Sequence, residues 1–203
     1  MGQLFTIGHS NHPAEHFILL LKQHGIEVLA DVRTRPVSGY CPHFSAPQIE
    51  RLVKDAGARY LFLGETLGGQ PRDSGLYDER GHALYWKMSD TPEFADGIGR
   101  LLKGIQNFRV AIMCSEENPS ICHRRLLVTK VLHARGVGVT HIRGDGRVET
   151  ETQILQAEEA ARPQLDFLAG FDEEAEKTAW KSIQSGLREK ALGSSSTPYE
   201  EPI

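Results

Sequence analysis

The sequence lacks any apolar stretch long enough to cross a membrane, and its first residues carry no basic segment of the kind that opens a secretory signal. No strictly apolar run is longer than five residues, as in 17–21, whereas a bilayer span needs about 20. Residues 1–4 contain no charged side chain. We therefore expect a soluble, cytoplasmic protein with no membrane partner.

Cysteine is scarce, since the chain contains only Cys41, Cys114 and Cys122. A low and odd number argues against the disulfide framework of a small secreted domain and leaves thiols free for chemistry. The Cys-x-x-Cys and His-Glu-x-x-His spacings of common zinc sites are also missing. The sequence therefore predicts neither a metal site nor a cofactor.

A net positive charge is absent as well. The 23 Lys and Arg residues are outnumbered by 27 Asp and Glu residues, which gives a formal net charge of −4. This balance excludes the global positive field of many nucleic-acid-binding proteins but leaves local basic patches open. The 203 residues, 39% of them hydrophobic and 25% charged, suffice for one ordinary α/β domain and a short appendage, but not for two catalytic domains.

Apolar, β-rich runs alternate with helical patterns along most of the chain, which is typical of a parallel sheet covered by helices. We expect buried strands at residues 4–7, 27–30, 60–63, 109–113 and 137–142, and helices that begin near Pro13, Ser45, Thr91 and Asn118. The sequence thus predicts an α/β fold: a single three-layer domain with a mostly parallel sheet flanked by helices, over residues 1–150.

Three segments fall outside this regular pattern. Residues 64–82 are rich in Gly and Asp and too long for a simple connection, and loops of that length are often functional. Residues 151–192 begin with an acidic amphipathic pattern and predict a helical extension. Residues 193–203 are rich in Ser, Pro and Glu, so we expect a disordered tail there.

Three of the predicted strands end in polar residues of the types that enzymes use. Because ligands of open parallel sheets bind beyond the carboxyl ends of the strands, we expect these side chains to converge on one site. They are His9 and Ser10 after the first strand, Asp31 and Arg33 after the second, and Cys114 with Glu116 after the fourth.

The segment after the fourth strand predicts an anion site. Asn118 is a typical cap for a helix over residues 119–134, which would place Cys122 and His123 in its first turn. Free backbone N–H groups and the positive helix end favour an anion there, and Arg124 follows directly. Cys122 itself has two open interpretations, a reactive thiolate favoured by the helix end or a small buried hydrophobe.

Acid/base and nucleophilic chemistry have four candidates: Asp31, Glu116, His9 and Cys114. Carboxyl groups act as general acids or bases when their pKa is raised, and histidine titrates near neutral pH without any shift. Arginines suit a phosphate or carboxylate on the substrate. The substrate-binding candidates are Ser10, Arg33, Arg35, Arg72, Cys122, His123 and Arg124.

These candidates favour a small cytoplasmic hydrolase or transferase that acts on a phosphate-bearing substrate, such as a nucleotide or a base within a nucleic acid. Two alternatives stay open. In one, Cys114 or Cys122 attacks the substrate or carries sulfur. In the other, the chain is a non-catalytic module that binds an anion or nucleic acid through the same arginines.

Six motifs follow one another between about residues 4 and 147: Thr6-Ile7-Gly8-His9-Ser10; Asp31-Val32-Arg33 with Pro36, Ser38 and Phe44; Tyr60 with Leu67-Gly68-Gly69; Cys114-Ser115-Glu116; Cys122-His123-Arg124; and His141-Ile142 with Asp145-Gly146. Together they resemble the DUF488 family, a group of bacterial and archaeal proteins named for unknown function. The resemblance implies an α/β domain and supplies no reaction. Its recurrent polar residues correspond here to His9, Ser10, Asp31, Arg33, Cys114, Glu116, Cys122, His123 and Arg124.

The chain departs from the family pattern at one point. In that family an arginine often follows the Leu-Gly-Gly turn directly, whereas here Gln70 follows it and Arg72 comes two residues later. The resemblance therefore does not by itself assign the family's arginine to Arg72.

Overall fold

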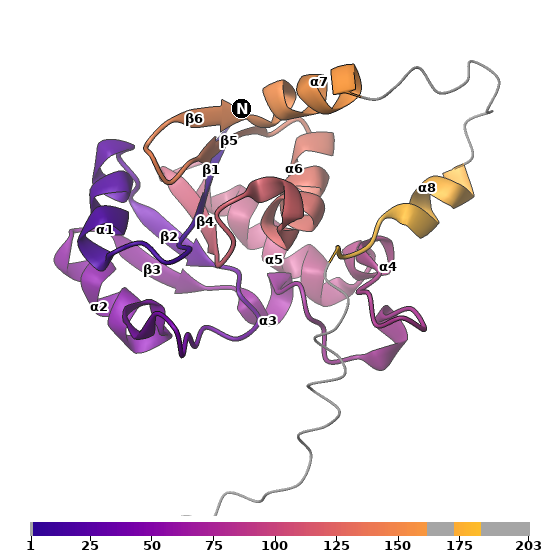
Figure 1. The fold of residues 1–203 in the computed structure, drawn as a ribbon, viewed down its shortest axis with the longest axis horizontal. Coiled ribbons are helices and arrows are strands. Elements are labelled where there is room, and N and C mark those ends of the chain that lie inside the picture. Colours follow the sequence, from indigo (N-terminus) through magenta and orange to yellow (C-terminus); the bar gives the residue numbers. More distant parts are fainter. Residues whose placement is uncertain (1, 162–172, 184–203) are drawn as a thin grey trace, which may run out of the picture.

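The structure, a computed structural model, describes residues 2–161 and 173–183, and these build one six-stranded sheet (Figure 1). The strands lie in the order β3-β2-β4-β1-β5-β6. Their bounds are Gln3–Gly8 for β1, Val28–Asp31 for β2, Arg59–Phe62 for β3, Val110–Cys114 for β4, Gly138–Ile142 for β5 and Val148–Thr150 for β6. The first five strands are parallel and β6 is antiparallel to β5. The expected α/β architecture is confirmed.

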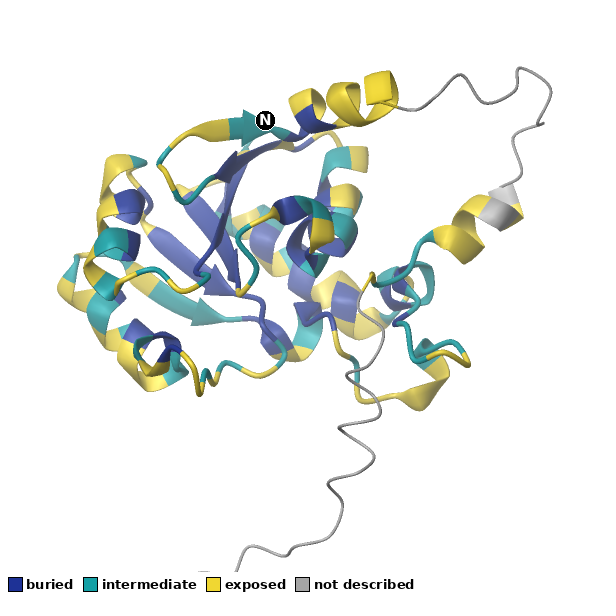
Figure 2. Ribbon diagram, in the orientation of Figure 1, coloured by how far each residue is buried: buried dark blue, intermediate teal, exposed yellow. Residues whose placement is uncertain are grey.

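Helices cover both faces of the sheet (Figure 1). One face carries α1 (Ala14–Gln23) and α2 (Ala46–Asp55), and the other carries α3 (Gly64–Leu67), α4 (Tyr85–Ser89), α5 (Pro92–Gly104) and α6 (Lys130–Ala134). Alternate side chains of β1 serve the two cores, since Leu4 packs on the α5 side whereas Phe5 and Ile7 pack on the α1 side. Figure 2 shows that β1, β2 and β4 are buried almost throughout.

Several of the sequence signals for helix ends operate as expected. Gly25 and Gly57 follow α1 and α2 with φ angles of 60° and 86°, a region that favours glycine. Thr91 caps α5, because its Oγ1 accepts a hydrogen bond from the backbone N–H of Phe94.

Short elements are the main additions to the expected pattern. The segment 64–82 is not a simple loop, since it contains α3 and a 3₁₀ turn at Ser74–Leu76. The helix α4 and the edge strand β6 also go beyond the expected elements. Elements of three to five residues are too short to show a hydrophobic period, which is why the sequence pattern does not reveal them.

The expected continuous helix over residues 119–134 is wrong. A 3₁₀ turn at Pro119–Ile121 comes first, closed by the Asn118 side chain, which accepts a hydrogen bond from the backbone N–H of Ser120. Cys122 is then extended (φ −117°, ψ 138°), and a π-helical segment, Arg124–Thr129, leads into α6. The Cys122 carbonyl accepts from the N–H groups of residues 125 and 126, so this cysteine precedes the helix and caps it.

The expected C-terminal extension contains α7 (Glu151–Ala161) and α8 (Glu173–Ala179). The predicted tail, residues 193–203, lies outside the described residues. No helix in the described part of the chain is both long enough and apolar enough to span a membrane.

Candidate functional site

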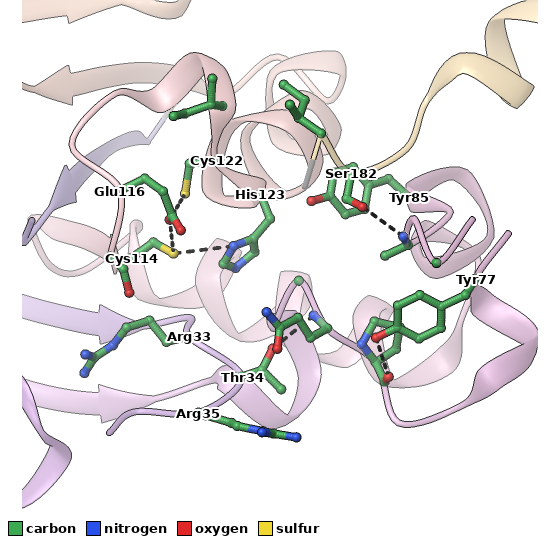
Figure 3. Close-up of a pocket in the computed structure, with 18 of the residues that line it drawn as sticks. Arg33, Thr34, Arg35, Tyr77, Tyr85, Cys114, Glu116, Cys122, His123 and Ser182 are labelled. Atoms are coloured by element: carbon green, nitrogen blue, oxygen red, sulfur yellow. Dashed lines mark hydrogen bonds between the residues drawn. The ribbon is translucent and has the colours of Figure 1, made fainter. Parts of the chain in front are cut away.

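A cavity of about 500 Å³ lies beyond the carboxyl ends of β2 and β4 (Figure 3). The segments that follow these two strands form one wall, and residues between 69 and 85 form another. Seven of the residues expected at the site line the cavity: Arg33, Arg35, Arg72, Cys114, Glu116, Cys122 and His123.

Four of these side chains converge on one point, as Figure 3 shows. Glu116 Oε2 accepts hydrogen bonds from both thiols, 3.1 Å from Cys114 Sγ and 3.0 Å from Cys122 Sγ. His123 Nδ1 lies 3.5 Å from Cys114 Sγ. We call these four residues the thiol cluster. Both cysteines are buried, although they border the cavity.

The main chain around the cavity orients the imidazole of the cluster. His123 Nε2 lies 2.9 Å from the carbonyl oxygen of Val32, to which it donates its proton. This bond directs Nδ1 toward Cys114. Gly69 packs against the ring so closely that an added Cβ would lie 2.6 Å from His123 Cγ. A glycine is therefore required at this position if the imidazole is to keep its place.

A buried arginine clamps the loop that carries the cluster. The Arg124 guanidinium donates to the main-chain oxygens of Glu116 and Glu117 and, at 3.3 Å, to Thr6 Oγ1. Gly8 permits the same close approach, because a Cβ there would lie 1.8 Å from the Glu116 carbonyl oxygen. The Gly-His-Ser motif at the end of β1 therefore contributes to the cluster through its glycine, which lets the loop pass close to the strand.

Burial and mutual contacts shift the ionisation of all four groups. Burial and the charge of Cys122 raise the pKa of Glu116. A hydrogen bond with Cys122, together with burial, raises the pKa of Cys114 well above its usual range. Although burial opposes it, hydrogen bonds from Cys114 and His123 lower the pKa of Cys122, and contact with Cys122 raises that of His123. Such perturbed groups beside a cavity are typical of functional sites.

Three of the expected site residues, Arg33, Asp31 and His9, form a buried brace, of which only Arg33 lines the cavity. The Arg33 guanidinium donates to Asp31 Oδ1 at 2.9 Å and Oδ2 at 2.6 Å, and Tyr60 donates to the same carboxylate at 2.7 Å. Arg33 also donates to His9 Nε2 at 3.1 Å. Asp31 and His9 do not line the cavity, and their side chains are engaged in this brace, so the catalytic roles expected for them remain predictions. Figure 3 shows the Arg33 guanidinium directed away from His123.

The expected anion site at the helix start is also corrected. Arg124 has no exposed surface and does not line the cavity, because its guanidinium is used by the loop clamp. Two backbone N–H groups assigned to an anion are used internally, that of Ser120 by Asn118 and that of Cys122 by Pro119. Ser10 is likewise outside the cavity lining.

Two arginines remain for a charged substrate. Arg35 and Arg72 are exposed and line the cavity, and neither forms an ion pair with a carboxylate in the described part of the chain. A cavity with two such guanidinium groups at its rim and no carboxylate but Glu116 among its described lining residues is suited to an anion.

Sequence reasoning missed several wall residues. Tyr85, from α4, is buried beside the thiol cluster, and burial with the nearby Cys122 raises its pKa. Ser182 and Ile183, from the segment after α8, also line the cavity. Ser182 is placed there by a pair of hydrogen bonds with Ala83, at 2.9 and 2.8 Å. No local motif marks these residues, since their positions depend on contacts distant in sequence.

Comparison with known proteins gives one match. A family model described as "Domain of unknown function DUF488" matches residues 13–131, which is more than half of the chain. The match confirms the family that the motifs suggest, over a shorter span than residues 4–147. No curated protein and no solved structure matches the chain.

Proposed function

This chain belongs to the DUF488 family, whose description names no reaction, and we propose that it is a hydrolase or transferase acting on a phosphate-bearing substrate such as a nucleotide or a nucleic-acid base. One observation carries this proposal. A single cavity is lined both by a carboxyl group in contact with two thiols and by two exposed arginines that have no carboxylate partner in the described part of the chain.

Glu116 is the acid/base group of the proposed reaction. It is the only carboxyl side chain among the described residues that line the cavity, and its contacts with the thiols engage Oε2 and leave Oε1 outside them. The carboxylate accepts a proton from water or from an acceptor hydroxyl as that oxygen bonds to the electrophilic atom. It then returns the proton to the leaving group as the bond to that group breaks.

Arg35 and Arg72 hold the anionic part of the substrate. Guanidinium groups bind phosphate through paired, charge-assisted hydrogen bonds, which fix its orientation as well as its place. Because both arginines and Glu116 line the same cavity, a substrate whose phosphate is anchored by the arginines has its remaining part available to Glu116.

The test compares two neighbouring carboxyl groups. We expect Glu116→Gln to lower kcat/KM by at least about 100-fold toward a panel of nucleoside mono- and diphosphates, assayed by chromatography of the products. Glu117→Gln is the matched control, since Glu117 pairs with Arg143 and does not line the cavity. Arg35→Gln and Arg72→Gln should weaken binding of inorganic phosphate by about tenfold. Equal activity of wild type and Glu116→Gln would overturn the proposal.

The thiols support a second candidate, a cysteine-dependent enzyme. Cys122 sits at the start of a helical stretch, where the helix dipole favours an anion such as a thiolate. Intact-protein mass spectrometry with the same substrates separates the two candidates, because only a nucleophilic cysteine gains a covalent adduct. Phosphate binding without turnover by any variant or wild type would instead indicate a non-catalytic anion-binding module.

A further inference from the structure

Three side chains at the floor of the cavity present donor atoms that suit a thiophilic metal ion. The sulfur atoms of Cys114 and Cys122 and a ring nitrogen of His123 all lie within 4.8 Å of one another. No other group of three His, Cys, Asp or Glu side chains in the described segments has this geometry. The sequence pattern predicts no metal because these ligands are not spaced as Cys-x-x-Cys, and only the fold brings them together.

The separations fit a tetrahedral ion. With bonds of about 2.3 Å to sulfur and about 2.0 Å to nitrogen, two thiolates on one zinc ion stand about 3.8 Å apart and a thiolate and an imidazole about 3.5 Å apart. Cys114 Sγ and His123 Nδ1 already stand 3.5 Å apart. All three donor pairs lie within 4.8 Å, so small rotations of the side chains suffice to close the site.

The surroundings also match those of a metal centre. Metal-binding imidazoles commonly donate their second ring N–H to a carbonyl or carboxylate, which fixes the tautomer. His123 does this through Nε2 and the carbonyl of Val32, at 2.9 Å. Arg124 fixes the loop between the two cysteines, because its guanidinium donates hydrogen bonds to the main-chain oxygens of Glu116 and Glu117. The three donors are thus held by contacts that do not depend on the ion.

The geometry points to a binding site for one divalent ion of the zinc type, with Cys114, Cys122 and His123 as its protein ligands. Two thiolates and an imidazole select zinc over magnesium or calcium, which prefer oxygen ligands. Three protein ligands leave a fourth tetrahedral position for water or substrate, an arrangement found in catalytic zinc sites. All three residues line the cavity that we propose as the substrate site.

The ion would add a Lewis acid to the acid/base function proposed above. The binding of the ion itself does not depend on that function. A bound zinc ion would supply a Lewis acid that lowers the pKa of water at the fourth position. Glu116, which contacts both ligand sulfurs, would be placed to accept a proton from that water and to return it to the leaving group.

Cobalt binding tests the site without any activity assay. Full-length protein is kept reduced, freed of metal with a chelator and titrated with Co²⁺, whose thiolate complexes have a strong charge-transfer absorption. We expect about one equivalent of Co²⁺ to bind with that absorption and with visible bands of tetrahedral intensity, and Zn²⁺ to displace it. Zn²⁺ should also protect Cys114 and Cys122, but not Cys41, from alkylation of the unmutated chain. Absence of the charge-transfer band, or alkylation unaffected by Zn²⁺, would overturn the inference.

Variants assign the ligands. Cys114→Ser, Cys122→Ser and His123→Gln should each abolish stoichiometric binding, with circular dichroism to show that the variant is folded. Cys41→Ser is the matched control, because Cys41 is buried in the core on the opposite face of the sheet. Glu116→Gln should keep the ion, and its loss there would overturn the assignment of three ligands. Normal metal binding with unchanged turnover in Glu116→Gln would refute the proposed function and leave the metal site intact.

Discussion

Buried charge determines which polar side chains of this protein are available for chemistry. Arg33 and Arg124 are almost fully buried, and both direct their guanidinium groups to oxygens within the protein. Removing charges from water is costly unless every donor finds a partner, so a buried arginine with several partners is held in place by them. Arg35 and Arg72, which are exposed, remain for a ligand.

The pH dependence of stability tests the buried brace in which Arg33 binds Asp31 and His9. The ring stacks on Phe44 with centroids 4.3 Å apart and accepts a hydrogen bond from Arg33, so it is held neutral. Burial and the charge of Arg33 lower its pKa from 6.5 to about 4. Because the unfolded chain binds a proton at higher pH than the native one, the stability due to neutral His9 is complete above about pH 6.5 and is lost as the pH falls through about 4.

We expect the wild type to lose on the order of 3 kcal/mol more free energy of unfolding than His9→Gln between about pH 7 and pH 4. Urea unfolding at the two pH values gives the difference, and the variant corrects for every other titrating group. An equal loss in both proteins would show that His9 does not carry the effect. NMR of the His9 ring gives a direct check, since the ring should stay neutral at about pH 5.

At the scale of elements, the strand ends and the turns beside them act as one unit. β1 lies next to β4, with Gly8 paired to Cys114, so the loop after β4 crosses directly over the end of β1. The turn after α3 packs against the residue that follows this loop, because Gly69 contacts the His123 ring. Two glycines far apart in the sequence thus set the space for the thiol cluster.

Replacement of these glycines by alanine should disturb the cluster. Gly8→Ala places a Cβ 1.8 Å from the Glu116 carbonyl oxygen, which only a backbone shift can relieve, so we expect a loss of about 3 kcal/mol in urea unfolding. Gly69→Ala, with its contact of 2.6 Å to His123 Cγ, should cost about 1–2 kcal/mol and weaken Co²⁺ binding. Gly99→Ala in α5 meets nothing within 4 Å and should be neutral or stabilising by up to about 1 kcal/mol. Similar losses for all three variants would contradict this account.

At the scale of the whole molecule, the C-terminal extension is tied to the sheet by ion pairs. Glu151, at the start of α7, accepts from Arg125 at 3.0 Å and lies 2.8 Å from His141 Nε2 on β5. Glu158 lies about two turns further along α7. Its carboxylate accepts hydrogen bonds from the two terminal nitrogens of the same guanidinium. The part of the chain that follows the family match at residue 131 therefore supplies the carboxylate partners of Arg125, a buried residue within the match.

Truncation separates these ion pairs from the rest of the extension. A chain ending at Thr150 leaves Arg125 and His141 buried without Glu151, so we expect it to be about 3–5 kcal/mol less stable than a chain ending at Ala161. The longer chain keeps both glutamates and lacks only the segment that includes Trp180 and Ser182. Urea unfolding of the two proteins and of Glu151→Ala gives the comparison. Equal stability of the two truncated chains would show that α7 contributes nothing to the sheet.

The sequence by itself determined the architecture and the location of the site along the chain. The alternation of β-rich runs with helical periods follows from burial on both faces of a parallel sheet, and it placed five of the six strands. The rule that ligands bind beyond strand ends indicated Cys114 and Glu116, both of which line the cavity. Both inferences depend only on residues close together in the sequence and on the periodicity of helices and strands.

Only the tertiary structure decided which strand-end side chains face the cavity. Asp31 looks as available in the sequence as Glu116, yet Arg33 and Tyr60 donate to both of its carboxylate oxygens, which leaves no oxygen for a substrate. The Arg124 guanidinium is likewise unavailable to a ligand, because it donates its hydrogen bonds to carbonyl groups of the preceding loop. The thiol cluster arises because Cys122 is extended rather than helical, which turns its sulfur toward Glu116. The pairing of buried charges and the path of this loop both depend on contacts between residues far apart in the sequence. A local sequence pattern therefore does not predict them.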